Sequence, residues 1–269
     1  MNAREKKFVH LVQAHYQIHG RHDLPWRKTN DPYKIIVSEV MLQQTQVERV
    51  LPKYNEFIRK WPTARALTRA SLAEVLRAWQ GLGYNRRAKL LHECAKIITN
   101  EHDGKWPQTH IEFTRLPGIG SYTAGAVMAF AFNQPVPIIE TNIRTVYLHH
   151  FFKNQSNVSE ATLMQVITKT LDTKHPREWY WALMDYGSFL KKNEGYHNQR
   201  AKSYTKQSTF KGSDREIRGA ILRELTFGAK TLAALQKLAF DPCRVETQVH
   251  KLLTEGMVAK SNRSYILPS

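Results

Sequence analysis

Apolar residues recur every three or four positions through most of the first 192 residues, and this spacing predicts helices throughout that part of the chain. Short turns rich in glycine, proline and aspartate separate the periodic segments. Alternating runs of valine, isoleucine and threonine, which are typical of strands, are nearly absent here. The sequence therefore predicts an all-α domain with short connections between its helices. The periodic segments are 33–57, 71–79, 88–98, 122–132, 162–171 and 179–190.

The chain changes character over residues 191–214, where polar residues and glycine replace most apolar ones. This composition predicts a linker or an extended wrap. Three short helical patterns and a hairpin pattern follow and resemble a winged helix–turn–helix, although a helical protein-interaction cap without DNA contact is the alternative. We expect one domain at 1–205 and a small winged-helix-like α+β domain at 206–269.

Basic residues outnumber acidic ones by 40 to 23, which gives a net charge of +17. This excess favours a polyanionic partner, because each neutralised phosphate releases condensed counterions; a generally basic protein, or one that meets acidic lipid, is the alternative. The sequence has no run of 18 apolar residues and a charged start, so we expect an intracellular, cytoplasmic protein without membrane contact. With only Cys94 and Cys243, a disulfide framework or a four-cysteine metal site is excluded.

The pentapeptide Leu116-Pro117-Gly118-Ile119-Gly120 directly precedes a helical run of small residues that begins at Ser121. Two glycines around one apolar residue allow a tight turn with positive φ and let another backbone approach closely. The amides at the start of the next helix would point outward, where a phosphate oxygen binds well. We expect Gly118, Gly120 and Ser121 to contact DNA; an ordinary glycine-capped corner is the alternative.

Four further motifs accompany the hairpin pentapeptide, in a fixed order along the chain. They are Leu24-Pro25-Trp26-Arg27, Ser38-Glu39-Val40-Met41-Leu42-Gln43-Gln44-Thr45-Gln46-Val47, Gly81-Leu82-Gly83-Tyr84 and Met184-Asp185-Tyr186-Gly187. In order and spacing, these motifs resemble those of the helix–hairpin–helix (HhH-GPD) DNA glycosylases, and within them the MutY family of adenine glycosylases. The resemblance covers roughly residues 20–192. It implies a two-lobed fold, with a six-helix barrel at about 33–145 and a second lobe formed by the N-terminus and 146–205.

Two carboxylates are the candidate catalytic groups. Breaking a purine's glycosidic bond puts positive charge on the sugar and negative charge on the base, so an acid and a carboxylate are both needed. Glu39 lies in an apolar stretch that would raise its pKa, and the resemblance makes it the acid that protonates adenine. Glu140 stands where the family has a catalytic aspartate, and its extra methylene moves the carboxylate by about 1.5 Å. Three consequences are open: the backbone shifts to compensate for the longer side chain, the sugar is held differently, or activity is weak. We expect Asn142 to orient the Glu140 carboxylate or to contact the DNA backbone.

The resemblance assigns further residues to the flipped base and the DNA. Tyr122 replaces the catalytic lysine of bifunctional relatives and cannot form a Schiff base, which predicts a monofunctional enzyme that uses water. Gln44 and Tyr84 match the residues that fill the hole left by a flipped base. The remaining DNA-binding candidates are Trp26, Arg27, Leu42 and Gln43 around the base, and Arg86 and Arg87, which form either phosphate contacts or a solvated basic face.

Two features of the MutY family are missing. Its relatives carry four cysteines for an iron–sulfur cluster after the Met-Asp-x-Gly helix, whereas residues 188–197 contain none, so we predict no cluster and no other cofactor. We also predict no metal site, because His149-His150 and His92-Glu93-Cys94 lack ligand geometry on a helix face. The segment from about Ser213 is too short for the long Nudix-like domain with which the family reads 8-oxoguanine, so we expect no such reader in these residues, and this weakens the prediction of that substrate.

The leading interpretation is a monomeric enzyme of base excision repair that acts on double-stranded DNA with a mispaired or damaged base. It would excise adenine opposite guanine or 8-oxoguanine, and it would be associated with the nucleoid in a bacterium. A mismatch thymine or uracil glycosylase is one alternative, because such relatives share the hairpin, the first-motif glutamate and the tyrosine. A catalytically impaired sensor of DNA distortion is the other, and Glu140 keeps it open.

Overall fold

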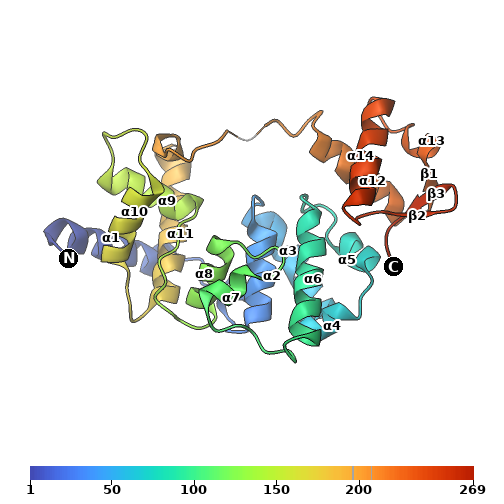
Figure 1. The fold of residues 1–269 in the computed structure, drawn as a ribbon. Helices are drawn as coiled ribbons and strands as arrows, with labels where there is room; N and C mark the ends of the chain where they lie inside the picture. The colour runs from blue at the N-terminus through green and yellow to red at the C-terminus, as the bar shows by residue number, and fades with distance from the viewer. Residues whose placement is uncertain (196, 207) are drawn as a thin grey trace. The chain divides into compact units, whose positions relative to one another are not determined.

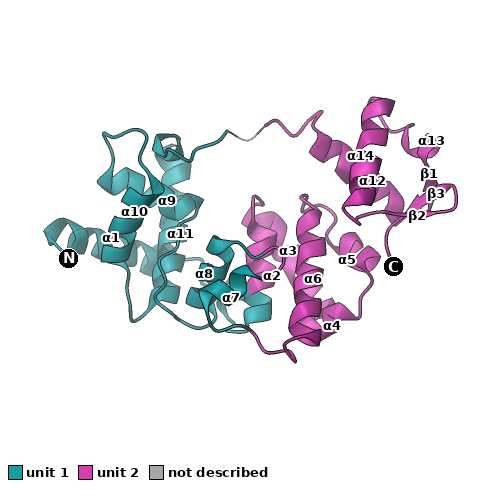
Figure 2. Ribbon diagram, in the orientation of Figure 1, with its two compact units in different colours: residues 1–35, 107–115, 119–206 teal, residues 36–106, 116–118, 207–269 magenta. Residues whose placement is uncertain are grey.

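The computed structural model describes residues 1–195, 197–206 and 208–269. The chain divides into two compact units, coloured separately in Figure 2. Unit 1 contains residues 1–35, 107–115 and 119–206, and unit 2 contains residues 36–106, 116–118 and 207–269. Helices make up most of both units (Figure 1), which confirms the predicted all-α class. No helix in the described ranges is long and apolar enough to cross a membrane.

Unit 1 is built around α11, which packs against both α1 and α9. The apolar positions of α11 bury Trp179, Tyr180 and Leu183 in the core. Helix α8 is buried at every position from residue 123 to 130, as its run of small and apolar residues predicts. The helices of unit 1 are α1 (Ala3–His19), η1 (Pro25–Arg27), α7 (His110–Thr114), α8 (Ser121–Phe130), α9 (Thr141–Phe151), α10 (Glu160–Thr170), α11 (Pro176–Asn193) and η2 (His197–Arg200).

The first part of unit 2 is a group of helices around the buried side chains of Phe57, Leu76 and Trp79. Helix α6 packs against α4 and α5, and capping by Thr63 and Ser71 fixes where α4 and α5 begin. Helix α2 begins in unit 1 and enters unit 2 at residue 36. The helices here are α2 (Pro32–Leu42), α3 (Val47–Lys60), α4 (Ala64–Thr68), α5 (Leu72–Ala78) and α6 (Arg86–Asn100).

The C-terminal part of unit 2 has the element order of a winged helix. It contains α12 (Asp214–Thr226), β1 (Lys230–Thr231), α13 (Leu232–Leu235), α14 (Pro242–Thr254), β2 (Ala259–Ser261) and β3 (Ser264–Ile266). The strands form an antiparallel sheet in the order β1-β3-β2. The predicted hairpin is confirmed, with Asn262 in the left-handed conformation (φ 53°) that its tight turn requires. Strand β1 was not predicted.

The division into units differs from the predicted boundary at residue 205. Residues 207–269 pack with residues 36–106, through a hydrogen bond of 2.6 Å from Lys89 Nζ to the Glu255 carbonyl and one of 2.9 Å from the Ala73 amide to the Pro268 carbonyl. Most of residues 107–145, which were predicted to join the barrel, pack in unit 1. In the predicted linker, no helix or strand is found between 201 and 213 within the described residues, apart from a bridge between Val158 and Ala201.

Candidate functional site

Glu39 stands on α2, in the part of that helix that belongs to unit 2. Its side chain is buried, with 6% of the residue exposed, and Val37, Val40 and Met41 around it are buried as well. The burial expected of Glu39 in this apolar stretch of the sequence is therefore confirmed.

Arg87 holds together the end of α2 and the loop before α6. Its guanidinium is buried, and the prediction that it contacts a phosphate is wrong, because its donors bind the protein's own oxygen atoms. Burial lowers its pKa to about 10, so it stays charged at neutral pH. The carbonyls at the end of a helix form the negative end of the helix dipole, where a cation is stabilised. Nη1 donates to the carbonyls of Val40, Met41 and Gln43, and Nη2 donates to Thr45 Oγ1 and to the carbonyls of Leu82 and Gly83.

The two loops joined by Arg87 carry Gln44 and Tyr84, the predicted wedge residues. Both residues are exposed and both have positive φ, 54° for Gln44 and 46° for Tyr84. Left-handed backbone at a residue with a side chain is uncommon and clusters at functional positions. The Tyr84 ring lies 5.5 Å from the Arg87 guanidinium and 5.3 Å from that of Arg215 on α12, which also donates a hydrogen bond to the Tyr84 hydroxyl.

The two glycines of the hairpin have different conformations. Gly118 has φ 75°, and a Cβ atom there would lie 2.8 Å from Leu90 Cβ, so both its backbone and its packing require glycine. Gly120 is the extended N-cap of α8, with φ −84°. A Cβ atom at Gly120 would meet nothing within 4 Å. Since sterics within the protein do not require glycine there, its place at a helix N-terminus suits close approach by a phosphate.

Glu140 is the N-cap of α9 in unit 1. Its Oε1 accepts hydrogen bonds of 2.7 Å from the amides of both Asn142 and Ile143. Burial raises the pKa of this carboxyl, and these two amides and the charge of Arg144 oppose the rise. The longer side chain thus reaches back to the first turn of its own helix, where aspartate is the more usual cap.

Close packing between helices fixes the segment around Glu140. A Cβ atom at Gly187 of α11 would lie 2.2 Å from the Asn142 carbonyl oxygen, so α11 crosses α9 at backbone contact. Asn198 donates hydrogen bonds of 3.0 Å to the Thr141 carbonyl and to Thr145 Oγ1. The start of α9 is therefore held from two sides.

The approach to Glu140 is held in the same way. A Cβ atom at Gly125 of α8 would lie 2.3 Å from Ile138 Cγ2. The Tyr180 hydroxyl donates to the Val136 carbonyl at 2.8 Å and accepts from the Ile138 amide at 3.1 Å. These contacts place the extended residues 136–140 within unit 1.

Arg27 and Trp26 were predicted to line the pocket for the flipped base. The Arg27 side chain is 4% exposed and forms a two-pronged ion pair with Asp185 of α11, with its Nη atoms 2.7 and 2.9 Å from the two carboxylate oxygens. Arg21 binds the same carboxylate. Arg27 therefore anchors η1 to α11, and the hollow that it lines contains none of the other predicted site residues. Trp26 is buried, and its contact with a base stays a prediction.

The other predicted residues are distributed between the two units. In unit 1, Tyr122 is half-buried and Ser121 is exposed at the start of α8, where His110 Nε2 lies 2.9 Å from the Ser121 carbonyl. In unit 2, Leu42 and Gln43 are half-buried at the end of α2, and Arg86 is exposed at the start of α6. Their roles toward DNA stay predictions.

The residues present do not fit an iron–sulfur cluster. Such a cluster is held by thiolates, and residues 188–197 contain no cysteine. Cys94 and Cys243 both lie in unit 2, on α6 and α14. Burial raises the pKa of the Cys94 thiol to about 12, which disfavours its thiolate.

The residues that position the site were not predicted from the sequence. Asp185 and Gly187 were recognised only as parts of a motif, and the contacts that require them are with residues far away in the sequence. The one available signal was a basic or acidic residue inside an otherwise apolar helical pattern, as Asp185 is. Asn198 lies in the polar segment that was predicted to be a linker, where nothing marks it.

Comparisons with known proteins agree with this picture. Residues 37–169 match the model of the HhH-GPD superfamily of base excision DNA repair proteins. The chain is 34% identical over 264 residues to an adenine DNA glycosylase of Mycolicibacterium smegmatis, covering 90% of both chains. It is 52% identical over 134 residues to an adenine DNA glycosylase of Mycobacterium tuberculosis, covering 49% of this chain and 44% of that protein.

A solved structure shares the fold. The structure of a thermostable thymine-DNA glycosylase superimposes with a TM-score of 0.62 and 27% sequence identity, over 69% of this chain and 86% of that one. Identity to the mycolicibacterial protein above 30% over nearly its whole length, together with the matching superfamily model, assigns the family. The chain belongs to the HhH-GPD superfamily of base excision DNA repair proteins and is similar in sequence to its adenine DNA glycosylases.

Proposed function

We propose that this protein is a monofunctional DNA N-glycosylase that removes adenine mispaired with guanine or 8-oxoguanine. The observation that carries the proposal is the burial of Glu39, in an apolar helix within the region that matches the family. The names of the relatives that match at 34% and 52% identity support adenine as the excised base.

Each of the two carboxyl groups has its own chemical role in the proposed reaction. Glu39 donates a proton to the leaving base, the role that the resemblance to the family gives this buried glutamate. Glu140 is held by two amides at the start of α9, and its carboxylate stabilises the positive charge that develops on the sugar. Water then completes the hydrolysis. The bond from the base to the sugar breaks as a proton moves from Glu39 to the base. The water oxygen then forms a bond to the sugar carbon, and the proton that the water loses restores the acid form of Glu39 by way of solvent.

Glutamate at position 140 is compatible with this role. Its added methylene is taken up by the side chain bending back to the amides of Asn142 and Ile143. The carboxylate is thereby fixed to the first turn of α9, as the shorter aspartate cap would be. Tyr122 offers no amine for a covalent intermediate, which favours hydrolysis without strand cleavage.

The DNA partner is a duplex with a mispaired base. The net charge of +17 supplies attraction to phosphates, and the exposed, left-handed Gln44 and Tyr84 fill the gap left by the flipped nucleotide. We propose that the protein acts as a monomer without an iron–sulfur cluster, in the compartment that contains the genome.

A panel of duplexes tests the proposal. The protein is incubated with DNA carrying A·8-oxoguanine, A·G, T·G, U·G or 8-oxoguanine·C, and abasic sites are then cleaved with alkali. We expect cleavage only of strands that carry adenine, and none before the alkali step. Cleavage of T·G or U·G alone would support a thymine or uracil glycosylase, and thymine-DNA glycosylase is the name of the structural neighbour. Tight binding without cleavage of any duplex would indicate a sensor.

A further inference from the structure

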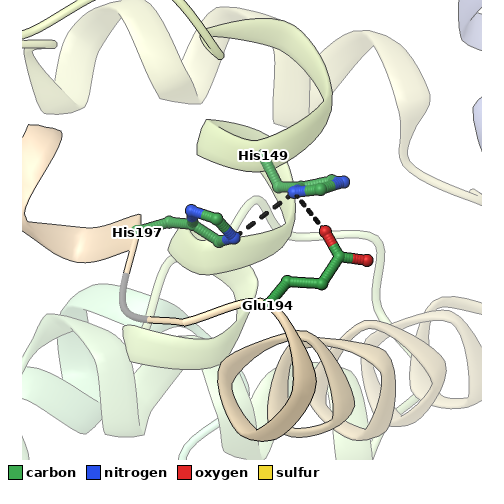
Figure 3. A group of neighbouring side chains, drawn as sticks. All are labelled: His149, Glu194 and His197. Atoms are coloured by element: carbon green, nitrogen blue, oxygen red, sulfur yellow. Dashed lines mark hydrogen bonds and ion pairs between the residues drawn. The ribbon is translucent and has the colours of Figure 1, made fainter.

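Three potential metal ligands lie together in unit 1, away from the residues assigned to excision. They are His149, Glu194 and His197, and Figure 3 shows their side chains pointing toward one another. His149 Nδ1 lies 3.3 Å from His197 Nε2 and 3.4 Å from Glu194 Oε2. All three ligand atoms lie within 4.8 Å of one another.

Three separate elements bring these side chains together. His149 lies in the last turn of α9, Glu194 is the residue that ends α11, and His197 begins η2. The sequence predicted no metal site at His149-His150, because one helix face offers no further ligand there. The other two ligands come from residues about 45 positions later in the chain, which only the fold brings near.

The spacing suits a tetrahedral ion. Zinc binds imidazole nitrogen at about 2.0–2.1 Å, so two ligand atoms of a tetrahedron lie about 3.3–3.4 Å apart. The two measured separations from His149 Nδ1 have this length. Two imidazoles and one carboxylate form a donor set that favours zinc over magnesium or calcium, which prefer oxygen atoms alone.

The charge and accessibility of the site also fit. The Glu194 carboxylate supplies negative charge against the nearby Arg200. The side chains of His149 and Glu194 are 19% and 47% exposed, so an ion can enter from solvent and keep a water as its fourth ligand.

We propose that His149, Glu194 and His197 form a zinc-binding site that joins the end of α9, the end of α11 and η2. The site is structural. Asn198 follows His197 directly and is hydrogen-bonded to the Thr141 carbonyl at the start of α9. Bound zinc therefore fixes both the end of α9, through His149, and its start, through the segment that carries Asn198.

Zinc titration of the full chain tests the proposal. The protein is stripped with a chelator and then titrated with ZnCl₂ by calorimetry, and with Co²⁺ to record its visible absorption. We expect one tight ion per chain, intense cobalt bands of a tetrahedral site, and a melting temperature that rises with zinc and falls again with chelator. Absence of a stoichiometric site in the wild-type protein would overturn the proposal.

Variants identify the ligands. His149→Gln and His197→Gln should each weaken zinc binding at least tenfold and abolish the cobalt bands, and Glu194→Gln should weaken binding as well. The control is His102→Gln, an exposed histidine outside the site, which should bind as the wild type does. Circular dichroism without metal shows whether each variant is folded. If a histidine variant is not folded, Glu194→Gln still tests the site, because the Glu194 side chain is exposed. Equal binding by all the variants would place the ion elsewhere.

Discussion

Two buried guanidinium groups hold the segments on which the candidate site residues stand. Arg87 in unit 2 binds backbone oxygens of both loops that carry Gln44 and Tyr84. Arg27 in unit 1 binds Asp185 and so fixes η1 on α11. In both cases the guanidinium is hydrogen-bonded by protein groups rather than by solvent, so removing one partner leaves a buried group unsatisfied.

The first prediction concerns Arg87. Arg87→Met should lower the free energy of unfolding by at least about 2 kcal/mol, because several buried carbonyls lose their donor, and it should also slow base excision. Arg87→Lys should not restore stability, since one ammonium group cannot reach two loops as a planar fork does. Urea unfolding gives the measurement, and Arg86→Met, at an exposed position, is the matched control. If Arg87→Met were as stable as Arg86→Met, the assigned role of Arg87 would be wrong.

The second prediction concerns acid stability and Asp185. Burial raises the pKa of this carboxyl, but the hydrogen bond and charge of Arg27 and the charge of Arg21 outweigh it and leave the pKa below the ordinary 3.8. The ion pair therefore stabilises the fold above pH 3.8, and this contribution is lost as the pH falls through the lowered pKa. Asp185→Asn should cost about 3–5 kcal/mol at pH 7, because Arg27 stays buried.

Urea unfolding at pH 7 and at pH 3 checks this assignment. The difference between wild type and Asp185→Asn should be large at pH 7 and smaller at pH 3. Asp23→Asn removes a fully exposed carboxylate and serves as control, with little effect at either pH. An equal difference for Asp185→Asn at both pH values would contradict the assigned cause.

At the scale of elements, glycine residues let neighbouring segments approach at backbone distance, and these close contacts set the position of the segment that carries Glu140. Gly187 of α11 lies against the backbone of Asn142, one turn from Glu140, and Gly125 of α8 admits Ile138. Such contacts transmit any change in helix spacing directly to the start of α9, since a packed interior does not deform smoothly.

The third prediction tests the crossing of α9 and α11. Gly187→Ala places a Cβ atom 2.2 Å from the Asn142 carbonyl oxygen, so the helices must move apart, at a cost of about 1–3 kcal/mol. Gly219→Ala in α12 is the matched control, because its Cβ would meet nothing within 4 Å and should stabilise the helix by about 0.5–1 kcal/mol. Thermal unfolding gives both values, and stabilisation by Gly187→Ala would show that the crossing is looser than described.

The fourth prediction tests whether α12 positions Tyr84. Arg215 lies over the Tyr84 ring and donates to its hydroxyl and, at 2.7 Å, to the Ser208 carbonyl. Arg215→Ala should slow excision about two- to fivefold, the equivalent of an exposed cation–π contact of about 0.5–1 kcal/mol. Arg223→Ala removes an equal charge from the same helix and should have a smaller effect. Equal effects of the two variants would mean that only their charge matters.

At the scale of the whole molecule, local patterns predicted local structure well. Helical periodicity indicated many of the helices of both units, although α1 and α9 lie outside the predicted periodic segments. The apolar neighbours of Glu39 predicted its burial. The two-residue strand β1 has no detectable pattern, because pairing with β3 alone defines it. The division into units depends on packing between segments distant in sequence, which periodicity does not report.

The candidate site was predicted less completely than the fold. The motif resemblance identified Glu39, Glu140 and the hairpin, but it misjudged side chains whose partners lie elsewhere in the chain. Arg87 stands in a basic run that looks like a solvated surface, and only its buried acceptors show otherwise. The hairpin pattern allowed positive φ at either glycine, and of the two only Gly118 adopts it. Long-range contacts decide such cases, and a single sequence does not contain them in readable form.

The central claim is that Glu39 supplies the proton that drives excision, and single-turnover kinetics of Glu39→Gln on an A·8-oxoguanine duplex tests it most directly. Glutamine has nearly the same shape but cannot donate an acidic proton. The account predicts a rate at least about a hundredfold below wild type, the usual contribution of a general acid, with the affinity for the duplex nearly unchanged. A rate within a fewfold of wild type, or a loss of affinity as large as the loss of rate, would contradict it.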